Sequence, residues 1–551
     1  MVFLGVDVGG THTDAVLLEE SGAGKVRVAA TAKALTKERI IDGLNEVLGE
    51  LLLKRKAKDV KRLTVSTTLG LNSVLTGTAD KVGILATQGP GLELDPSDWG
   101  DLFRSLDGQQ DHRGHVVKPL DPQAALQAAK ELANLKVDAF VVASKFGPKN
   151  PQLEQSMFEA CTAVHRGPVM AASRLFGGLN FPRRLAGAVL NAAVKRLYET
   201  FLTDLTQSAC AQGLNCPIKI LKADGGVMSM EAAREKPVLA LAAGPAASLL
   251  GLWALTADDD QDDILMIDMG GTSTDLALFS RGRPLMTPIG LTLARRPTLV
   301  RGLLTRSIAL GGDTDLEFKD GAPSIVARRR GPALAFAPKD LGQRPPTLTD
   351  AFNVLGLCAL GDTEVSKKAF ELVSPGQAVE MARRATEVAL TTLKDAVDEF
   401  IRQVNQQPVY TISDYLVDWR LDPHQAIILG GPAHTMAPLV EKSLSIPTKA
   451  PEGAATANAL GASLAKPTVE AELYADTEYG TLSVPTLNYY RNIDSRYRLE
   501  NAKAELLKLM GGEQISITAE ESFNQLSDRG QSGKVIRVAA QSATGLIASL
   551  I

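Results

Sequence analysis

Residues 4–18 read LGVDVGGTHTDAVLL, and this stretch decides how the rest of the chain is interpreted. Two apolar runs, each typical of a buried strand, flank a turn made of Gly, Thr and Asp. Many glycine-containing turns have this composition and no chemical role. One copy of the pattern therefore predicts a strand–turn–strand unit and leaves its function open.

A second copy of the pattern lies at residues 264–279, which read ILMIDMGGTSTDLALF. An offset of 261 residues aligns Asp7 with Asp268 and Asp14 with Asp275, and six of the eight aligned positions are identical. Both copies stand between apolar, strand-like runs. Self-similarity of this kind indicates two copies of one structural unit, and it favours a shared ligand over two unrelated turns.

The residue types of the two turns suit a polyphosphate. Glycine lets backbone N–H groups approach a ligand closely, and successive N–H groups form a nest for anions. Threonine hydroxyls add donors, whereas a carboxylate reaches phosphate only through a cation. We therefore predict that Asp7 and Asp268 hold Mg²⁺ or Mn²⁺, directly or through water, and act in catalysis. The predicted phosphate-binding residues are Gly9, Gly10, Thr11, His12, Thr13, Gly270, Gly271, Thr272, Ser273 and Thr274.

A third glycine-containing turn follows the strand-like run at 425–429. Gly430, Gly431 and Pro432 precede a helical pattern in AIILGGPAHTMAPLVEKSL. Such a turn allows a flat base to pack against backbone, which predicts an adenosine site. A plain strand-to-helix turn explains the same residues equally well.

Composition and patterning predict a multidomain α/β protein. The 551 residues exceed one compact core, so we expect two to four domains. Strand-like runs alternate with amphipathic helical patterns, which favours mostly parallel sheets. The expected strands are 2–8, 14–19, 25–31, 62–66, 81–86, 137–143, 217–222, 263–268, 273–279 and 425–429. The expected helices are 36–54, 122–135, 151–164, 183–212 and 377–404.

Charge and cysteine usage exclude several partners. The net charge is −4 with both signs mixed along the chain, which argues against nucleic acid as the main partner. The four cysteines have no zinc-ligand spacing. The first residues lack the features of a signal peptide, and no apolar run reaches the ~18 residues that a bilayer requires. We expect a cytoplasmic protein with no membrane contact.

The order of these segments resembles the actin-like ATPase superfamily, in which two ribonuclease-H-like domains flank a nucleotide cleft. The closer resemblance is to the hydantoinase A/5-oxoprolinase family, which includes subunits of acetone and acetophenone carboxylases. It covers residues 2–465 and rests on stretches such as VSTTLGLNSVL, LKADGGVMS, AAGPAASLLG, RSIALGGDTD and PEGAATANALGA. The resemblance implies one domain at 1–182, a second at 183–466 with an insertion near 318–349, and a C-terminal extension at 467–551 of unknown role.

The same resemblance implies an ATP-dependent amidohydrolase, or its ATPase subunit, that phosphorylates a carbonyl compound or cyclic amide. It also implies ATP as the nucleotide, a hydantoinase B-like second subunit and an oligomer. The chain has Val65-Ser66 where the family usually carries His-Gly, which leaves the substrate open. A small-molecule kinase and a non-enzymatic nucleotide-binding switch on the same scaffold therefore remain alternatives.

Four other residues are weaker candidates. Asp224, in Ala-Asp-Gly-Gly-Val, is predicted to orient a water or accept a proton, and a turn-forming Asp is an equal alternative. Thr68, Asn72 and Asp313 are candidates for substrate contacts, with helix or loop caps as the alternative.

Two aspartates and one arginine run carry structural expectations. Asp14 and Asp275 are expected to hold their hairpins by Asx-type bonds. The run Arg328–Arg330 is typical of a solvated surface, because no aromatic residues interleave with it.

Overall fold

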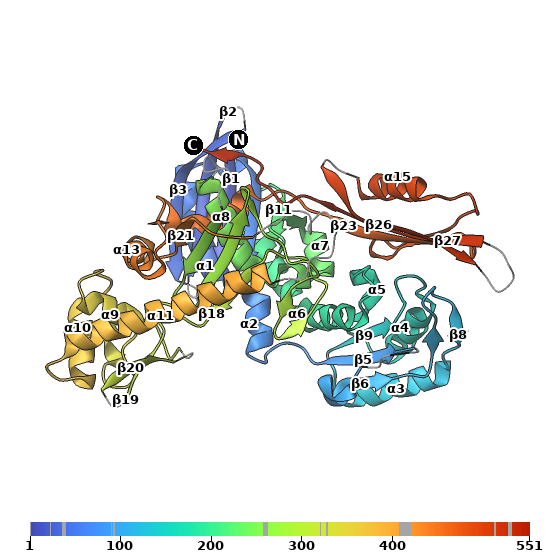
Figure 1. The fold of residues 1–551 in the computed structure, drawn as a ribbon, viewed down its shortest axis with the longest axis horizontal. Coiled ribbons are helices and arrows are strands. Elements are labelled where there is room, and N and C mark those ends of the chain that lie inside the picture. Colours follow the sequence, from blue (N-terminus) through green and yellow to red (C-terminus); the bar gives the residue numbers. More distant parts are fainter. Residues whose placement is uncertain are drawn as a thin grey trace.

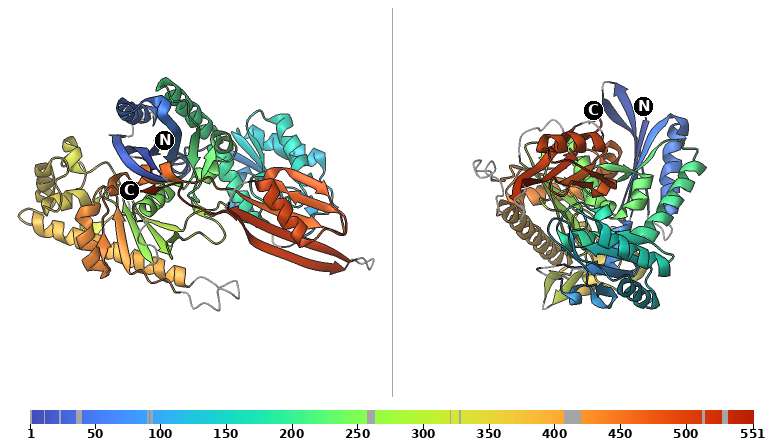
Figure 2. Two further views of the ribbon diagram at one scale, coloured as in Figure 1. Left: turned by 90° about the horizontal axis from the view of Figure 1, so that it is seen from above. Right: turned by 90° about the vertical axis from the view of Figure 1, so that its right-hand side faces the viewer.

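The computed structural model describes residues 2–551 except 11, 23, 36–39, 90, 92–93, 257–262, 320, 327–328, 407–419, 512–513 and 527–531. Two central lobes each contain a mixed sheet (Figure 1). A small α/β subdomain and a C-terminal sheet lie together at one end of the molecule, and a mainly helical insertion lies at the other (Figure 2). In the described ranges no helix combines the length and apolar character that crossing a bilayer requires.

The first lobe is a seven-stranded sheet in the order β12-β11-β4-β1-β2-β3-β28. Its central strands are β1 (Val2–Val8), β2 (His12–Gly22), β3 (Lys25–Leu35), β4 (Val60–Thr67) and β11 (Ile218–Leu221), and its edges are β12 (Val227–Ser229) and β28 (Ser549–Leu550). The first three strands form an antiparallel meander, and β4 and β11 continue it in parallel with β1. The buried leucines of β1 and β4 pack with those of α1 (Ile40–Lys54) and α6 (Phe181–Ala211). Since β11 and β12 belong to this sheet, the first lobe extends past the predicted boundary at residue 182.

The second lobe repeats this arrangement. Its sheet runs β15-β14-β13-β21-β22, with β18 beside β14. The strands are β13 (Ile264–Met269), β14 (Thr274–Ser280), β15 (Arg283–Pro284), β18 (Thr305–Ile308), β21 (Gln425–Leu429) and β22 (Thr448–Lys449). β13 is antiparallel to β14 and parallel to β21, as β1 is to β2 and β4. Asp7 pairs with Asp14, and Asp268 with Asp275, in the same register, so the sequence repeat corresponds to a structural repeat.

The two lobes meet through short helices rich in small residues. α14 (Ala457–Leu464) packs against α8 (Ala243–Leu255) on one side and against β1 on the other. A Cβ on Gly461 would lie 2.0 Å from the Ala247 carbonyl oxygen, and one on Gly251 would lie 2.0 Å from that of Ala457. The two helices therefore touch backbone to backbone, and any larger side chain at these glycines would force them apart.

The α/β subdomain interrupts the first lobe. Its parallel sheet has the order β10-β9-β5-β6, built from β5 (Val82–Thr87), β6 (Phe103–Ser105), β9 (Ala139–Ser144) and β10 (Val169–Ala171). Every residue of β5 and β9 is buried, as expected for parallel strands covered on both faces. α3 (Pro122–Asn134) and α4 (Gln152–Val164) cover one face. The insertion of the second lobe comprises β19 (Leu316–Lys319), β20 (Ala322–Ile325), α9 (Leu348–Val354), α10 (Thr363–Val373) and α11 (Ala378–Asn405).

The C-terminal extension forms its own antiparallel sheet, β25-β24-β23-β27-β26, with α15 (Leu499–Met510) packed on it. Its strands are β23 (Glu470–Asp476), β24 (Thr481–Val484), β25 (Tyr489–Asn492), β26 (Ile515–Leu526) and β27 (Ser532–Ser542). Arg113 of the α/β subdomain reaches this sheet and donates two hydrogen bonds of 2.7 Å to Asp476 and one of 2.9 Å to Glu478. Its guanidinium also stacks 3.9 Å from the centre of the Tyr479 ring. This contact, which we call the Arg113 clamp, fastens the extension to the subdomain.

Candidate functional site

The two predicted hairpin turns have the same internal geometry. In the first turn the Gly9 N–H donates to the His12 carbonyl (3.0 Å), and in the second the Gly270 N–H donates to the Ser273 carbonyl (2.9 Å). Among the described turn residues, Gly10, Gly270 and Thr272 are exposed, so a ligand can reach their backbone. Thr11 lies outside the described residues.

Two of the predicted phosphate contacts are restricted by packing. Thr13 is fully buried, with its hydroxyl directed at Gly43 of α1. The hydroxyl of Thr274 donates to the carbonyl of Leu310 and is also fully buried. The alternation of a β-strand places both side chains on the inner face of the sheet. Their hydroxyls serve packing in this structure, and a phosphate contact from either residue would have to use the backbone.

A chain of polar side chains joins the two aspartates across the lobes. The Asn458 amide of α14 donates to Asp7 Oδ2 (3.2 Å). The Ser248 hydroxyl of α8 lies 2.8 Å from Asn458 Oδ1 and also hydrogen-bonds to Asp268 Oδ2. Hydrogen bonds through Asn458 and Ser248 therefore link one carboxylate from each lobe.

Burial disfavours the ionised form of both carboxylates. It raises the pKa of Asp7 to about 6, with a smaller opposing effect from Ser66 and Asn458. It also raises the pKa of Asp268, and the charge of Asp14 adds to this rise. Asp7 Oδ1 is buried and has no hydrogen-bond partner among the described residues. A divalent cation would satisfy this orphaned oxygen and neutralise both acids, so the donor set of Asp7 and Asp268 fits Mg²⁺ with water and phosphate oxygens as the other ligands.

The loop after β18 packs directly on the second turn. The Asp313 N–H donates to the Gly271 carbonyl (2.7 Å), and a Cβ on Gly271 would lie 2.7 Å from Asp313 Oδ2. Asp313 also accepts a 2.9 Å hydrogen bond from Arg329. Burial and the charge of Lys33 lower the pKa of His12, and the charges of Asp313 and Arg329 act on the same ring. His12 of the first turn therefore lies near the Asp313–Arg329 pair of the second lobe. Arg328, the first residue of the predicted surface run, is outside the described part of the chain.

The remaining candidates lie beside one or other turn. Gly430 follows β21, next to Asp268, and has a φ of +97°, which favours glycine. Gly431 has open space around it, and Pro432 caps α13 (Ala433–Leu444). Thr68 precedes α2 (Leu69–Leu75), and its N–H donates to the Val8 carbonyl at the end of β1 (3.4 Å).

Asn72 of α2 also lies at the first turn. Its amide hydrogen-bonds to the Thr68 hydroxyl (3.3 Å) and would be 3.6 Å from a Cβ on Gly10. The Thr68 side chain does not cap α2, whereas the Thr67 hydroxyl accepts from the Leu69 N–H (3.1 Å). Local capping therefore uses Thr67, and Thr68 and Asn72 lie beside the first turn.

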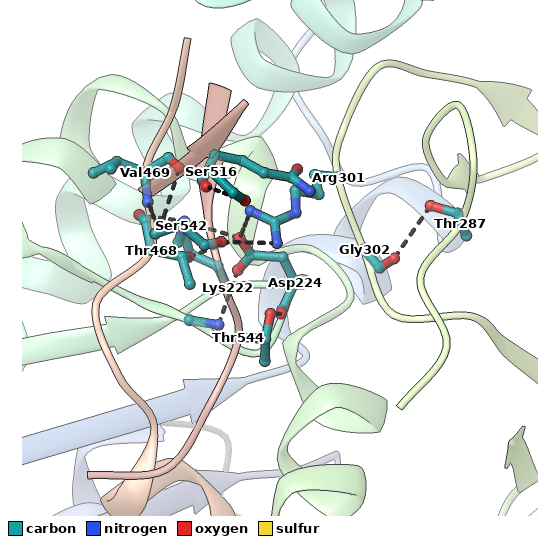
Figure 3. Close-up of polar contacts among 12 residues, drawn as sticks. Lys222, Asp224, Thr287, Arg301, Gly302, Thr468, Val469, Ser516, Ser542 and Thr544 are labelled. Carbon is teal, nitrogen blue, oxygen red and sulfur yellow. Dashed lines mark hydrogen bonds and ion pairs between the residues drawn. The ribbon is translucent and has the colours of Figure 1, made fainter. Parts of the chain in front are cut away.

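Asp224 lies in a different setting, a buried cluster of opposite charges. Lys222, Arg301 and the Thr468 hydroxyl converge on its carboxylate, at 3.2, 3.6 and 2.7 Å (Figure 3). Burial alone would raise the pKa of Asp224, but Lys222 and Arg301 outweigh it and lower the pKa below its ordinary value. Thr544 donates to its main-chain carbonyl (2.7 Å). These contacts of Asp224 anchor the C-terminal extension and do not include either hairpin, and its catalytic role stays a prediction.

Sequence reasoning did not single out Asn458 or Ser248. Both stand in stretches of small apolar residues, GAATANALGASLA and AAGPAASLLG. The available signal was a single polar side chain within an otherwise apolar helix. Such a side chain is buried with the helix and must form a hydrogen bond to a partner there.

Asp275 supports a prediction on stability. Burial, with a further contribution from Asp268, raises its pKa to about 7 from 3.8. The folded state therefore keeps a proton on Asp275 up to about pH 7, whereas the unfolded state loses it near pH ~4. The stability that this proton contributes is fully present below pH ~4 and is lost as the pH rises through about 7. Asp275→Asn removes the buried charge, so it should stabilise the protein at pH 8 by roughly 1–3 kcal/mol. Urea unfolding at pH 8, 6 and 5 should show the gain shrinking with acidity. A gain that is independent of pH would contradict the assignment.

Comparison with known proteins places this geometry in a family. The hydantoinase/oxoprolinase family matches residues 184–471, and its N-terminal region matches residues 3–164. The alpha subunit of caprolactamase from Pseudomonas jessenii is 25% identical over 383 residues, which are 65% of this chain and 55% of that subunit. The chain spans 52–62% of the lengths of the first curated relatives that it matches.

Two solved structures share the fold. An acetone carboxylase chain, from a nucleotide-free structure, superposes with a TM-score of 0.72 at 17% identity and covers 100% of this chain and 89% of that one. The ATP-dependent caprolactamase of Pseudomonas jessenii superposes with a TM-score of 0.69 at 19% identity and covers 98% and 87%. The predicted α/β fold is confirmed. Because the family match extends over more than half of its residues, the chain belongs to the hydantoinase/oxoprolinase family.

Proposed function

We propose that the chain binds Mg²⁺-ATP between its two hairpins and phosphorylates the carbonyl oxygen of a cyclic amide. The observation that carries the proposal is the pair of Gly-Thr-Asp turns, one from each lobe, whose aspartates are linked through Asn458 and Ser248. Backbone N–H groups of the turns would bind the phosphates, and the Gly430–Pro432 turn would pack against adenosine. Mg²⁺ held by Asp7 and Asp268 would neutralise charge that develops on the transferred phosphoryl group.

The proposed reaction explains why ATP would be needed. An amide carbonyl is a poor electrophile, and O-phosphorylation makes its carbon reactive. The carbonyl oxygen attacks the γ-phosphorus, ADP leaves, and the amide nitrogen loses its proton. One water then adds to the carbon and the C–N bond breaks to give a ring-opened acyl phosphate, and a second water releases phosphate. The named relatives are subunits of larger enzymes, so we propose that a second subunit supports the hydrolytic steps.

Product analysis tests this proposal. Purified protein, alone and with a co-purified second subunit, should hydrolyse ATP faster when a lactam or hydantoin is added, and it should release phosphate and ring-opened acid in equal amounts. A stable phosphorylated compound would instead identify the kinase alternative. A slow ATPase that ignores every compound in the panel would favour the nucleotide switch.

Arg329 is expected to contact the terminal phosphate. It is bonded to Asp313 against the second turn, and its charge reaches His12 of the first turn. Removing one donor to a developing charge costs roughly 10²-fold in turnover, so we expect Arg329→Gln to lower ATP turnover by about that factor and to weaken ATP binding more than ADP binding.

A neighbouring arginine provides the matched control. Arg330 is equally exposed, 35% against 31%, but pairs with Asp315 and Glu317. Arg330→Gln should keep ATP turnover near the wild-type value. Equal losses of turnover in the two variants, measured by steady-state phosphate release, would contradict a contact between Arg329 and the terminal phosphate.

A further inference from the structure

A cavity of about 470 Å³ beside the Asp224 cluster has no role in the proposed nucleotide site. Three separate parts of the chain line it: residues 175–178, residues 286–301 and the C-terminal sheet. Tyr474 of the C-terminal sheet donates a hydrogen bond to the carbonyl of Gly177, one of the lining residues (3.0 Å). The volume of the cavity falls in the range of small-molecule sites.

One side of the cavity is apolar. Leu175, Phe176, Met286, Ile289 and Leu299 line it. A ligand that fills this side must present mainly hydrocarbon to it, although Thr287 and Thr486 also line the cavity.

The other side carries four charged residues, and three of them are already paired. Arg537 lies 3.3 Å from Glu472 and 2.9 Å from Glu521. Arg301 is held by Asp224 and by the Ser542 carbonyl, as Figure 3 shows. Only Glu470 has no hydrogen bond or ion pair with any described residue.

Glu470 is therefore an unused acceptor that opens into the cavity. Solvent reaches its side chain, yet the surrounding protein desolvates the carboxylate and raises its pKa, with partial compensation from Lys222 and Arg301. Lys236 also lies within electrostatic range. A ligand that displaces this solvent would have to donate a hydrogen bond to the carboxylate, because a carboxylate without water or another donor is costly.

The charge balance selects a neutral ligand. Four basic side chains around the cavity match its four acids. The bases are Arg301, Arg537, Lys222 and Lys236, and the acids are Asp224, Glu470, Glu472 and Glu521. An ammonium group on the ligand would therefore add an uncompensated positive charge. The side chains of Thr518 and Gln541 lie on the same wall and offer donors to a carbonyl oxygen. An N–H donor and a C=O acceptor on one edge of a compact apolar ring are the features of a cyclic amide.

We propose that this cavity binds a neutral cyclic amide, with the Glu470 carboxylate accepting its N–H and the ring packed against the apolar wall. The site gives the C-terminal extension a role in holding the ligand. The proposal takes its ligand class from the proposed function and rests on it in that respect, although binding here requires no nucleotide.

The test is a binding measurement on the nucleotide-free full chain by calorimetry or ligand-observed NMR. δ-Valerolactam should bind, its N-methyl derivative should bind at least about tenfold more weakly, and cyclohexylamine should not compete; tenfold corresponds to about 1.4 kcal/mol. Glu470→Ala should weaken valerolactam binding by about tenfold or more, whereas Glu500→Ala, an exposed site on α15, should not. Ala519→Leu, which fills the cavity from β26, should also abolish binding and guards against misfolding of the Glu470 variant.

Several results would overturn the proposal: no binding of any lactam, equal binding of the N-methyl compound, or unchanged binding in both cavity variants. Lactam-stimulated ATP hydrolysis that survives Glu470→Ala would leave the proposed function standing and reject this site. Glu470-dependent lactam binding without any stimulated ATP hydrolysis would support this site and reject the proposed function.

Discussion

Asp7→Asn and Asp268→Asn are each expected to lower ATP turnover by ~10²–10³-fold. Each change removes a negative charge beside one of the two turns, and an amide is a poor ligand for Mg²⁺ compared with a carboxylate. The asparagines keep the size of the side chains, so Asn458 and Ser248 can retain their hydrogen bonds. Phosphate release at saturating Mg²⁺-ATP is the measurement.

The first hairpin contains its own control. Asp14 stands opposite Asp7 in the strand pairing but is held by Lys33 at 3.0 Å. Asp14→Asn should cost no more than about tenfold in turnover, because its main effect is electrostatic and partly screened. Undiminished turnover in both Asp7→Asn and Asp268→Asn would mean that the metal is not held where we place it.

Asp224→Ala is expected to destabilise the protein by roughly 3–5 kcal/mol. The change leaves Lys222 and Arg301, whose side chains are only 9% and 11% exposed, without their shared anion, and uncompensated buried charge carries a cost of about this size. It also removes the acceptor of the Thr468 hydroxyl, which fastens the start of the C-terminal extension. Urea unfolding at neutral pH gives the free energy of unfolding directly.

A milder variant separates structure from catalysis at this position. Asp224→Asn keeps an acceptor for Thr468 but loses the charge, so it should be destabilised less than Asp224→Ala. If Asp224→Asn were as stable as the wild type and yet lost turnover, the predicted catalytic role would be supported over the anchoring role.

The sequence predicted the strands and helices that a local residue pattern marks, and the two hairpins whose residue types suit a ligand. The ten expected strands and five expected helices all occur, because continuous apolar runs mark buried strands and a 3.6-residue period marks amphipathic helices. Residues 36–39 of the expected helix 36–54 lie outside the described part of the chain. The two hairpins were found through their repeat. The stretch that contains α14, PEGAATANALGA, was found through the resemblance rather than through periodicity.

Long-range partnerships were not predictable in the same way. The C-terminal sheet depends on pairing β23 with β27, some 60 residues apart, and its β26 strand alternates weakly because Glu, Ser and Thr occupy many positions. The charge cluster at Asp224 needs Arg301 and Thr468, which no local pattern connects to it. The sequence indicated only that Asp224 is an acidic residue in a turn. The tertiary structure shows that Lys222 and Arg301 neutralise its charge.

The Arg113 clamp bears on where a recombinant version of this protein can end. A chain cut at residue 471, where the family match stops, would lack Asp476, Glu478 and Tyr479, the partners that hold the Arg113 guanidinium. That guanidinium would then face solvent beside a newly uncovered surface of the subdomain. Shortened versions designed from the family boundary alone would thus risk aggregation, and expression should run through residue 551.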